Sequence, residues 1–249
     1  MKNYIYIILV ILLCACNGEN VPDCFQNSGD IVVKEFPVSE FTKITVFEHV
    51  EMILKEAAEH KVTVSTGEFL MDEIEVIVEN GRLKLYDNNG CNLTRDYGIT
   101  KITVEAPNVE EIRSSTGLPI RSEGILNYPN LILLSEDFND PEAITRDGLF
   151  DLEVSTINLS VTVNALSSMF IKGATENLNV NFVSGDARFE SRFLIAQNVT
   201  LYHRGTNDIT VNPQQSLNAN LVSTGDVIVV NTPPIITVQE QYSGRVIFE

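Results

Sequence analysis

The sequence predicts an all-β chain: a β-helix or β-solenoid preceded by an N-terminal portion rich in β-hairpins. Three observations predict it. Apolar and polar residues alternate with a period of two after Phe41, as they do in half-buried strands. No stretch has the period of a long amphipathic helix. From about residue 99, strands led by Asn or Ser recur at nearly constant intervals.

The N-terminal portion contains short alternating segments and one clear hairpin. The segments 44–46, 50–54 and 62–64 alternate in this way. The hairpin joins 74–79 to 82–86 through Asn80-Gly81, the pair of residues that favours a type I′ turn. Residues 68–73, between these strands, are compatible with one helical turn.

The repeat is clearest where Leu159, Leu178, Val199 and Leu217 each follow an Asn or Ser, at steps of 19, 21 and 18 residues. A period near 20 with Gly, Asn and Asp at the corners and no helix is typical of a β-solenoid, in which stacked rungs share one core. The alternative is a β-sandwich with a strand every 8–12 residues. The longer step from Asn130 to Asn158 predicts an inserted loop.

The first residues predict export and lipidation. One Lys precedes an apolar run from Tyr4 to Leu13, too short to span a membrane and typical of a signal peptide. Leu13-Cys14-Ala15-Cys16 is similar to a bacterial lipobox. We therefore expect a signal peptide at 1–15, lipidated Cys16 with a tether over 16–36, and one domain over 37–249. The lipid would hold the chain at the cell envelope, with the outer membrane favoured and the face left open.

Composition narrows the range of partners. The chain carries 34 acidic and 17 basic residues, a formal net charge of −17. Such a surface repels phosphate backbones, so nucleic acid is excluded as a natural partner.

Two further cysteines, Cys24 and Cys91, remain after processing. Outside the inner membrane the compartment is oxidising, which favours a disulfide between them. The alternative is two free thiols. Their spacing excludes a Cys-x-x-Cys redox motif.

Over residues 36–248 the chain resembles the bacterial family described as putative auto-transporter adhesin, head GIN domain. The resemblance rests on patterns of apolar and small residues: Phe41-x-x-Ile44-x-Val46, Lys61-Val62-Thr63-Val64, Ile102-Thr103-Val104-x-Ala106-Pro107, Ser115-Thr116-Gly117 and the Gly-Asp pairs at 185–186 and 225–226. It implies a right-handed, helix-like β fold and membership among Bacteroidota lipoproteins. It brings no catalytic, cofactor or metal residues, and the chain departs from the pattern at Thr116-Gly117-Leu118, where relatives are richer in Gly.

The residues do not assemble an evident metal site. His49, His60 and His203 lie far apart in sequence and lack metal-ligand spacing, and His203 is expected on an outer corner. The acidic stretch 135–142 is expected to be a solvated loop, with a Ca²⁺ site as the alternative.

Three aspartates, Asp186, Asp208 and Asp226, recur at equivalent repeat positions. They are expected to form a column of turns, with a catalytic carboxylate pair as the alternative. The chain has no Trp for stacking on sugars, and Tyr128, Tyr202 and Tyr242 are the candidates that remain. Phe170, Phe182 and Phe189 are expected to stack in the core.

We therefore expect a lipid-anchored envelope protein that acts as an adhesin or binding module, with no catalytic residue and no cofactor. Its expected partners are the membrane, through the lipid, and a glycan or an envelope protein. The alternatives are a β-helix enzyme acting on polysaccharides and a purely structural envelope protein that associates through its ends.

Overall fold

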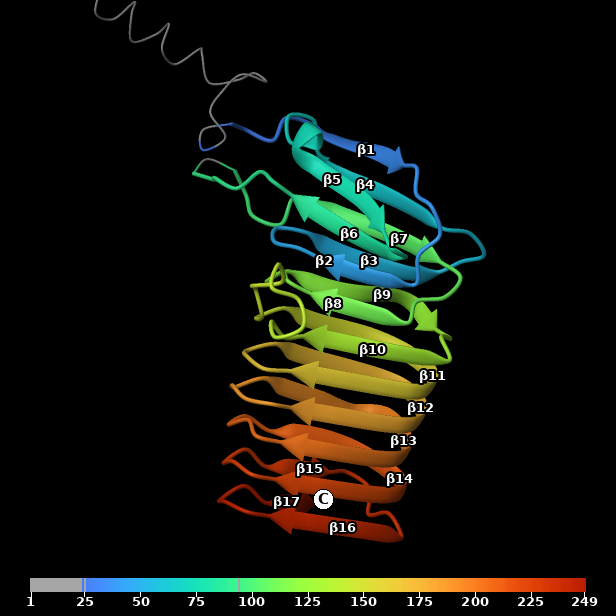
Figure 1. Ribbon diagram of the computed structural model, residues 1–249, viewed down its shortest axis with the longest axis vertical. Helices are drawn as coiled ribbons and strands as arrows, with labels where there is room; N and C mark the ends of the chain where they lie inside the picture. Colours follow the sequence, from blue (N-terminus) through green and yellow to red (C-terminus); the bar gives the residue numbers. More distant parts are fainter. Residues whose placement is uncertain (1–23, 25, 94) are drawn as a thin grey trace, which may run out of the picture.

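The computed structural model describes residues 24, 26–93 and 95–249, and over these residues the fold is all-β (Figure 1). Seventeen strands form one hydrogen-bonded network. Their bounds are β1 (Ile31–Phe36), β2 (Lys43–Val46), β3 (Glu51–Glu56), β4 (Lys61–Gly67), β5 (Ile74–Glu79), β6 (Arg82–Asp87), β7 (Lys101–Ala106), β8 (Glu111–Ser114), β9 (Pro119–Leu126), β10 (Asn130–Ser135), β11 (Leu149–Val163), β12 (Ser168–Phe182), β13 (Arg188–His203), β14 (Ile209–Leu221), β15 (Val227–Val229), β16 (Ile235–Glu240) and β17 (Val246–Phe248).

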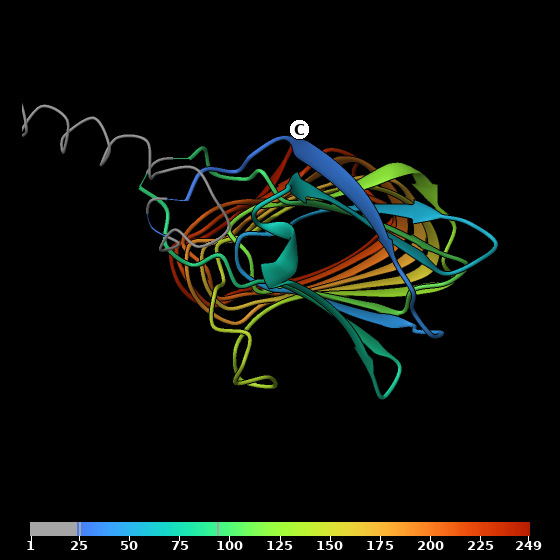
Figure 2. The same cartoon turned by 90° about the horizontal axis from the view of Figure 1, so that it is seen from above.

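The network folds into two walls that enclose one apolar core, and Figure 2 looks along the stack. One wall, called here the β16 wall, runs β5-β6-β2-β8-β10-β11-β12-β13-β14-β16. The other, the β17 wall, runs β1-β4-β7-β3-β9-β11-β12-β13-β14-β15-β17. The long strands β11 to β14 bend at a corner and so belong to both walls.

The sequence repeat is a parallel register in the structure. Asn158 pairs with Asn177, Asn177 with Asn198, and Asn198 with Ser216. The apolar residue after each of these is buried. One circuit of the chain, from a strand to its parallel partner, is called a rung below. Because a β-sandwich is antiparallel, the parallel register shows that the sandwich alternative is wrong. The loop expected between Asn130 and Asn158 is the corner 136–148.

The N-terminal rungs confirm the local predictions. β5 and β6 form an antiparallel hairpin whose turn residues, Asn80 and Gly81, have φ of 52° and 74°, as a type I′ turn needs. Met71–Glu73 form a single 3₁₀ turn. The end of the segment expected to be a tether, 16–36, differs from that expectation, because Ile31–Phe36 form strand β1, which lies antiparallel to β4.

The rungs do not stack in the order in which they occur along the chain, and the sequence repeat does not indicate this. The rung of β2 and β3 lies between the rung of β6 and β7 and the rung of β8 and β9. The chain after β7 therefore passes the first rung before it starts β8. The Glu110 N–H donates a hydrogen bond of 2.7 Å to the Thr42 carbonyl, which holds the segment between β7 and β8 against the start of β2.

Cys24 and Cys91 form a disulfide with an S–S distance of 2.03 Å, the pair that the sequence favours. It ties the N-terminal arm to the corner 88–100, between β6 and β7. The signal peptide expected at 1–15 and the lipidation expected at Cys16 lie outside the described residues. Within the described residues, no helix has the length and apolar character needed to cross a membrane.

Candidate functional site

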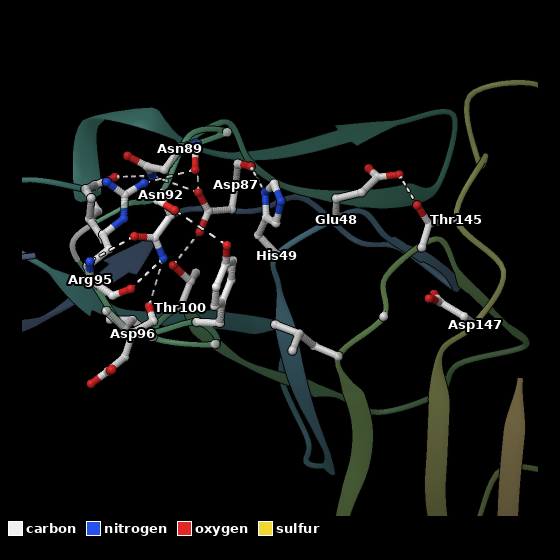
Figure 3. A pocket seen from close by; sticks show the side chains of 17 residues that line it. Glu48, His49, Asp87, Asn89, Asn92, Arg95, Asp96, Thr100, Thr145 and Asp147 are labelled. Atoms are coloured by element: carbon white, nitrogen blue, oxygen red, sulfur yellow. Dashed lines mark hydrogen bonds between the residues drawn. The ribbon is translucent and has the colours of Figure 1, made fainter. Parts of the chain in front are cut away.

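A pocket of about 440 Å³ opens at the corners where strands of the β16 wall turn into strands of the β17 wall (Figure 3). Four successive rungs supply its lining through the corners 47–50, 88–100, 115–118 and 136–148. The second and the fourth of these corners are long, whereas the equivalent corners 164–167 and 183–187 are short. The volume lies in the range typical of small-molecule sites.

A buried polar network forms one side of the pocket. The Asp87 carboxylate accepts hydrogen bonds from the Asn89 N–H at 3.0 Å, the Asn89 side-chain amide at 2.7 Å and the Thr100 hydroxyl at 2.5 Å. Thr100 also shares a hydrogen bond with Thr66, 2.8 Å away. Buried networks of this kind fix the groups that form them, so both ends of the corner 88–100 are held to the strands beneath it.

The corner 88–100 is also braced from within. The Asn92 amide donates to the Arg95 carbonyl at 2.7 Å and its oxygen accepts from the Arg95 N–H at 2.9 Å. The Arg95 guanidinium donates to the Asn89 carbonyl at 3.0 Å and to the Gln26 carbonyl at 3.3 Å. Together with the disulfide at Cys91, these bonds hold this rim of the pocket in place.

The opposite side is built on Glu48 and the corner 136–148. The Glu48 carboxylate accepts from the Thr145 hydroxyl at 2.7 Å and from the Ser115 hydroxyl at 3.4 Å, which joins three corners. The Asp147 carboxylate lies beside Gly117, where an added Cβ would be 3.3 Å from its oxygen. Figure 3 shows Glu48 and Asp147 on the side of the pocket away from the Asp87 network.

The lining combines four carboxylates with one guanidinium, one imidazole, one phenol and three apolar side chains, so its charge is negative on balance. Glu48, Asp96 and Asp147 contribute acceptors, and His49, with φ of 68°, places Nδ1 3.3 Å from the Asp87 carbonyl. Tyr97 is 80% exposed, so a face of its ring is open to a ligand. Carboxylates accept hydrogen bonds from hydroxyl and ammonium groups and repel anions. The pocket therefore suits a neutral or cationic polar ligand.

The structure brings only one of the three histidines to this site. His60 lies elsewhere, with Nε2 2.9 Å from the Phe41 carbonyl. His203 is fully buried, so its expected place on an outer corner is wrong. It pairs in register with Phe182, which is an inward position of the alternating strand. No group of three or more metal-ligating side chains occurs in the described part of the chain.

The aspartates expected in a column contact the neighbouring rungs. Asp186 accepts from the Thr206 hydroxyl at 2.6 Å, Asp208 from the Asp226 N–H at 3.0 Å, and Asp226 from the Arg245 N–H at 2.8 Å. This is the geometry of a turn column, and these residues lie outside the corner pocket.

The acidic stretch 135–142 differs from the expected solvated loop. Ser135 and Glu136 are fully buried, and Glu136 forms an ion pair with Arg113, 2.7 Å away. The second oxygen of Glu136 accepts from the N–H groups of Phe138 and Asn139, at 2.9 and 3.1 Å. These contacts shape the corner beside the pocket.

The aromatic residues expected to bind sugars or to stack in the core differ in whether their rings point into the core or out to solvent. Tyr128 is buried with its hydroxyl bonded to the Ala106 carbonyl, so it is not a platform for sugars. Phe182 and Phe189 are core residues, as expected. Phe170 is wrong as a core residue, since it points outward beneath the Arg188 guanidinium, 5.7 Å away.

Tyr202 lies half-buried on the β16 wall, and Tyr242 is 66% exposed near the C-terminal end. The sequence reasoning overlooked Tyr97 and the pocket around it. The long intervals at 88–100 and 136–148 were the available signal, because corner loops of that length on a regular repeat mark inserted functional segments.

Comparisons with known proteins agree with this architecture. The family model described as putative auto-transporter adhesin, head GIN domain, matches residues 40–233. No curated protein matches the chain.

Several solved structures share the fold. A putative adhesin from Bacteroides fragilis has a TM-score of 0.78 at 18% identity, covering 90% of this chain and 99% of that one. A putative lipid binding protein from Parabacteroides distasonis has a TM-score of 0.62 at 16% identity, covering 88% and 97%. A putative adhesin from Parabacteroides merdae has a TM-score of 0.57 at 12% identity, covering 88% and 97%. At these identities the likeness concerns the fold, whereas the family match spans most of the chain. The chain belongs to the putative auto-transporter adhesin, head GIN domain family.

Proposed function

We propose that this protein is a lipid-anchored, non-catalytic binding module of the adhesin class at the cell envelope, and that the corner pocket is one of its ligand sites. The observation that carries the proposal is the pocket itself. Two long corners extend from an otherwise regular stack, and a disulfide and a buried carboxylate network fix one of them around a cavity of about 440 Å³. The family and the solved neighbours, described as putative adhesins, support the same class of function.

The proposed chain plan is a signal peptide at 1–15, lipidated Cys16 at the head of the segment 16–36, and a single domain over 37–249 that strand β1 of this segment joins. In this plan the parallel rungs form a right-handed β-solenoid. The lipid would hold the chain at the outer membrane. The disulfide at Cys24 gives this plan a geometric consequence. Eight residues of extended chain reach roughly 28 Å, so an anchor at Cys16 would keep the pocket end near the membrane and let the C-terminal rungs project away.

The lining favours a small polar ligand such as a sugar or an amino sugar. Hydroxyl and ammonium groups would donate to Glu48 and Asp147, and a ring would lie on the exposed face of Tyr97. An acyl chain is the alternative that the description of one neighbour as a putative lipid binding protein raises. The carboxylates disfavour it, because burying them against hydrocarbon is costly.

Calorimetric titration with neutral sugars and amino sugars tests the pocket. We expect saturable binding that Tyr97→Ala weakens at least tenfold. Tyr242→Ala is the matched control, since it removes an exposed ring of the same kind far from the pocket. Equal affinity in both variants would exclude the pocket as the site. Release of products from polysaccharides by the same preparation would overturn the non-catalytic assignment.

The anchor has its own test. Mass spectrometry of the N-terminal peptide should find acyl chains on Cys16, and Cys16→Ser should move the protein from the membrane fraction to the soluble fraction. An unmodified Cys16 in membrane-bound protein would contradict the lipid anchor.

A further inference from the structure

We propose that the outward face of the β16 wall is a second binding surface, which takes a chain of neutral polysaccharide. The strands of this wall follow one another down the molecule (Figure 1). On β11 to β14 and β16 the outward side chains form three columns, and the polar members of these columns are called here the polar grid. The first column ends on β16 at Ile235, which is exposed and apolar and is not counted in the grid. Its members are Asn158, Ser160, Thr162, Asn177, Asn179, Asn181, Asn198, Thr200, Tyr202, Ser216, Asn218, Asn220, Thr237 and Gln239.

The polar grid contains no charged residue, although charged residues make up 20% of the chain and the net charge is −17. The β17 wall of the same rungs shows the contrast. Its outward side chains form ion pairs, Lys172 with Glu153 at 3.2 Å and Arg188 with Glu190 at 3.4 Å. Since both walls enclose the same core, folding the stack does not require an uncharged outer face.

The columns of the grid differ in how their hydrogen bonds are used. In the first column, Asn158, Asn177, Asn198 and Ser216 bond to one another at 3.0, 3.1 and 2.8 Å, and this ladder fixes their side chains. In the middle column, Asn179, Thr200, Asn218 and Thr237 are exposed. Within the described residues, the side chains of this middle column form no hydrogen bond. Their amide and hydroxyl groups are therefore open to a ligand beside a column that is already ordered.

The chemistry of the grid matches a polymer of hydroxyl groups. Amides and hydroxyls both donate and accept hydrogen bonds, as sugar hydroxyls do. Neighbouring strands lie about 4.8 Å apart and alternate residues about 6.7 Å apart, so the grid offers a regular array of such groups. Tyr202 adds an aromatic ring at the edge of the array.

Charge selects among the candidate partners. An anionic polymer would be repelled by a body with a net charge of −17, and a second copy would carry the same charge. The grid itself offers no charge with which to pair a cationic partner. A neutral polysaccharide is not repelled by the negative charge and needs no charged partner on the grid. It can also lie across several rungs at once. This surface is separate from the corner pocket, so the inference stands if the pocket binds nothing.

Native affinity electrophoresis tests the surface with the exported full chain carrying Cys16→Ser, in gels that contain β-glucan, mannan or galactomannan. The decisive variant is Asn179→Ala with Asn218→Ala, which removes the amide donors and acceptors of two residues in the middle column and leaves the net charge unchanged. The matched control is Glu153→Ala with Lys172→Ala, which truncates two outward side chains on the opposite wall and also leaves the net charge unchanged. Gels with polygalacturonate provide the anionic comparison, and thermal melting checks that each variant is folded.

We expect at least one neutral polysaccharide to retard the protein, at least tenfold weaker binding by the grid variant, and unchanged binding by the control. Polygalacturonate should not retard it. Equal retardation of the two variants, or no retardation by any neutral polymer, would overturn the inference. So would concentration-dependent dimers that the grid variant abolishes, because the face would then bind a second copy. Loss of sugar binding in Tyr97→Ala with polysaccharide retardation intact would separate the two sites.

Discussion

Arg113 and Glu136 form an ion pair that is closed off from solvent, with their side chains 5% and 0% exposed and Nη1 2.7 Å from Oε1. The pair links β8 to the corner 136–148, and Asp140 lies 3.7 Å from the same guanidinium. A carboxylate at this depth is stable only while the guanidinium and the two loop N–H groups remain bonded to it. The shape of one side of the corner pocket therefore depends on a charge that the sequence suggested was solvated.

Glu136→Gln should strongly destabilise the fold. Breaking one partner of a buried pair costs about 3–5 kcal/mol when the other charge is left uncompensated. Asp140, 3.7 Å from the Arg113 guanidinium, offsets part of this cost. Urea unfolding measures the change. Glu123→Gln is the matched control, since its pair with Lys55 is 45% and 59% exposed and should leave the free energy of unfolding almost unchanged. Similar midpoints for both variants would contradict the role assigned to Glu136.

The ladder on the β16 wall should make Asn177→Ala more destabilising than Asn179→Ala. Asn177 donates to Asn158 at 3.0 Å and accepts from Asn198 at 3.1 Å, whereas Asn179, two residues away on the same face, has no side-chain hydrogen bond within the described residues. A net hydrogen bond contributes about 1 kcal/mol, and less at an exposed site. We expect a loss of about 1 kcal/mol for Asn177→Ala and nearly none for Asn179→Ala, measured by urea unfolding. Equal losses would mean that the ladder contributes nothing.

These asparagines also show how much the sequence could reveal. The leaders Asn158, Asn177 and Asn198 predicted the period, the register and the buried residue after each, because a parallel stack repeats its pattern from rung to rung. The position of β2 and β3 between later rungs could not be predicted from the sequence. The order of the rungs depends on contacts such as that of Glu110 with Thr42, which produce no periodic pattern in the sequence. His203 and Phe170 were misplaced for a simpler reason. Strand β13 continues to His203, two residues after the buried Leu201, so alternation points His203 inward. Phe170 lies between two buried residues of β12, so the same alternation points it outward.

Gly225→Ala should disturb the packing of the last rungs. A Cβ there would lie 2.2 Å from the Asn207 carbonyl oxygen and 2.4 Å from His203 Nε2, and neither the backbone nor the buried ring can move freely. Overpacking of this kind costs about 1–3 kcal/mol. Gly90→Ala is the control, because its Cβ would come no closer than 3.9 Å to another group. Thermal melting should show a lowered midpoint for the first variant alone; matching midpoints would show that the rungs can separate.

Removing the disulfide should weaken both the fold and the pocket. The bond joins residues 67 positions apart. In the chain-entropy model, closing a loop of this length stabilises the fold by about 4 kcal/mol. The variant with Cys24→Ser and Cys91→Ser should melt at a lower temperature and bind pocket ligands more weakly, because the corner 88–100 loses one support. Protein with an intact disulfide under oxidising conditions is the reference. Unchanged sugar affinity would show that the hydrogen bonds of Arg95 and Asn92 hold the corner by themselves.

His203 should make stability depend on pH in the mildly acidic range. Burial lowers the pKa of His203 below its ordinary value of 6.5, and the nearby Asp208 and Asp226 oppose this shift only in part. Between the lowered pKa and 6.5 the unfolded chain binds a proton that the folded chain does not, so the stability from His203 is complete above 6.5 and is lost as the pH falls. Urea unfolding from pH 7.5 to pH 5 should show this decline, and it should be smaller in His203→Gln, whose amide does not titrate. Parallel curves for the two proteins would show that His203 accepts its proton inside the fold without cost.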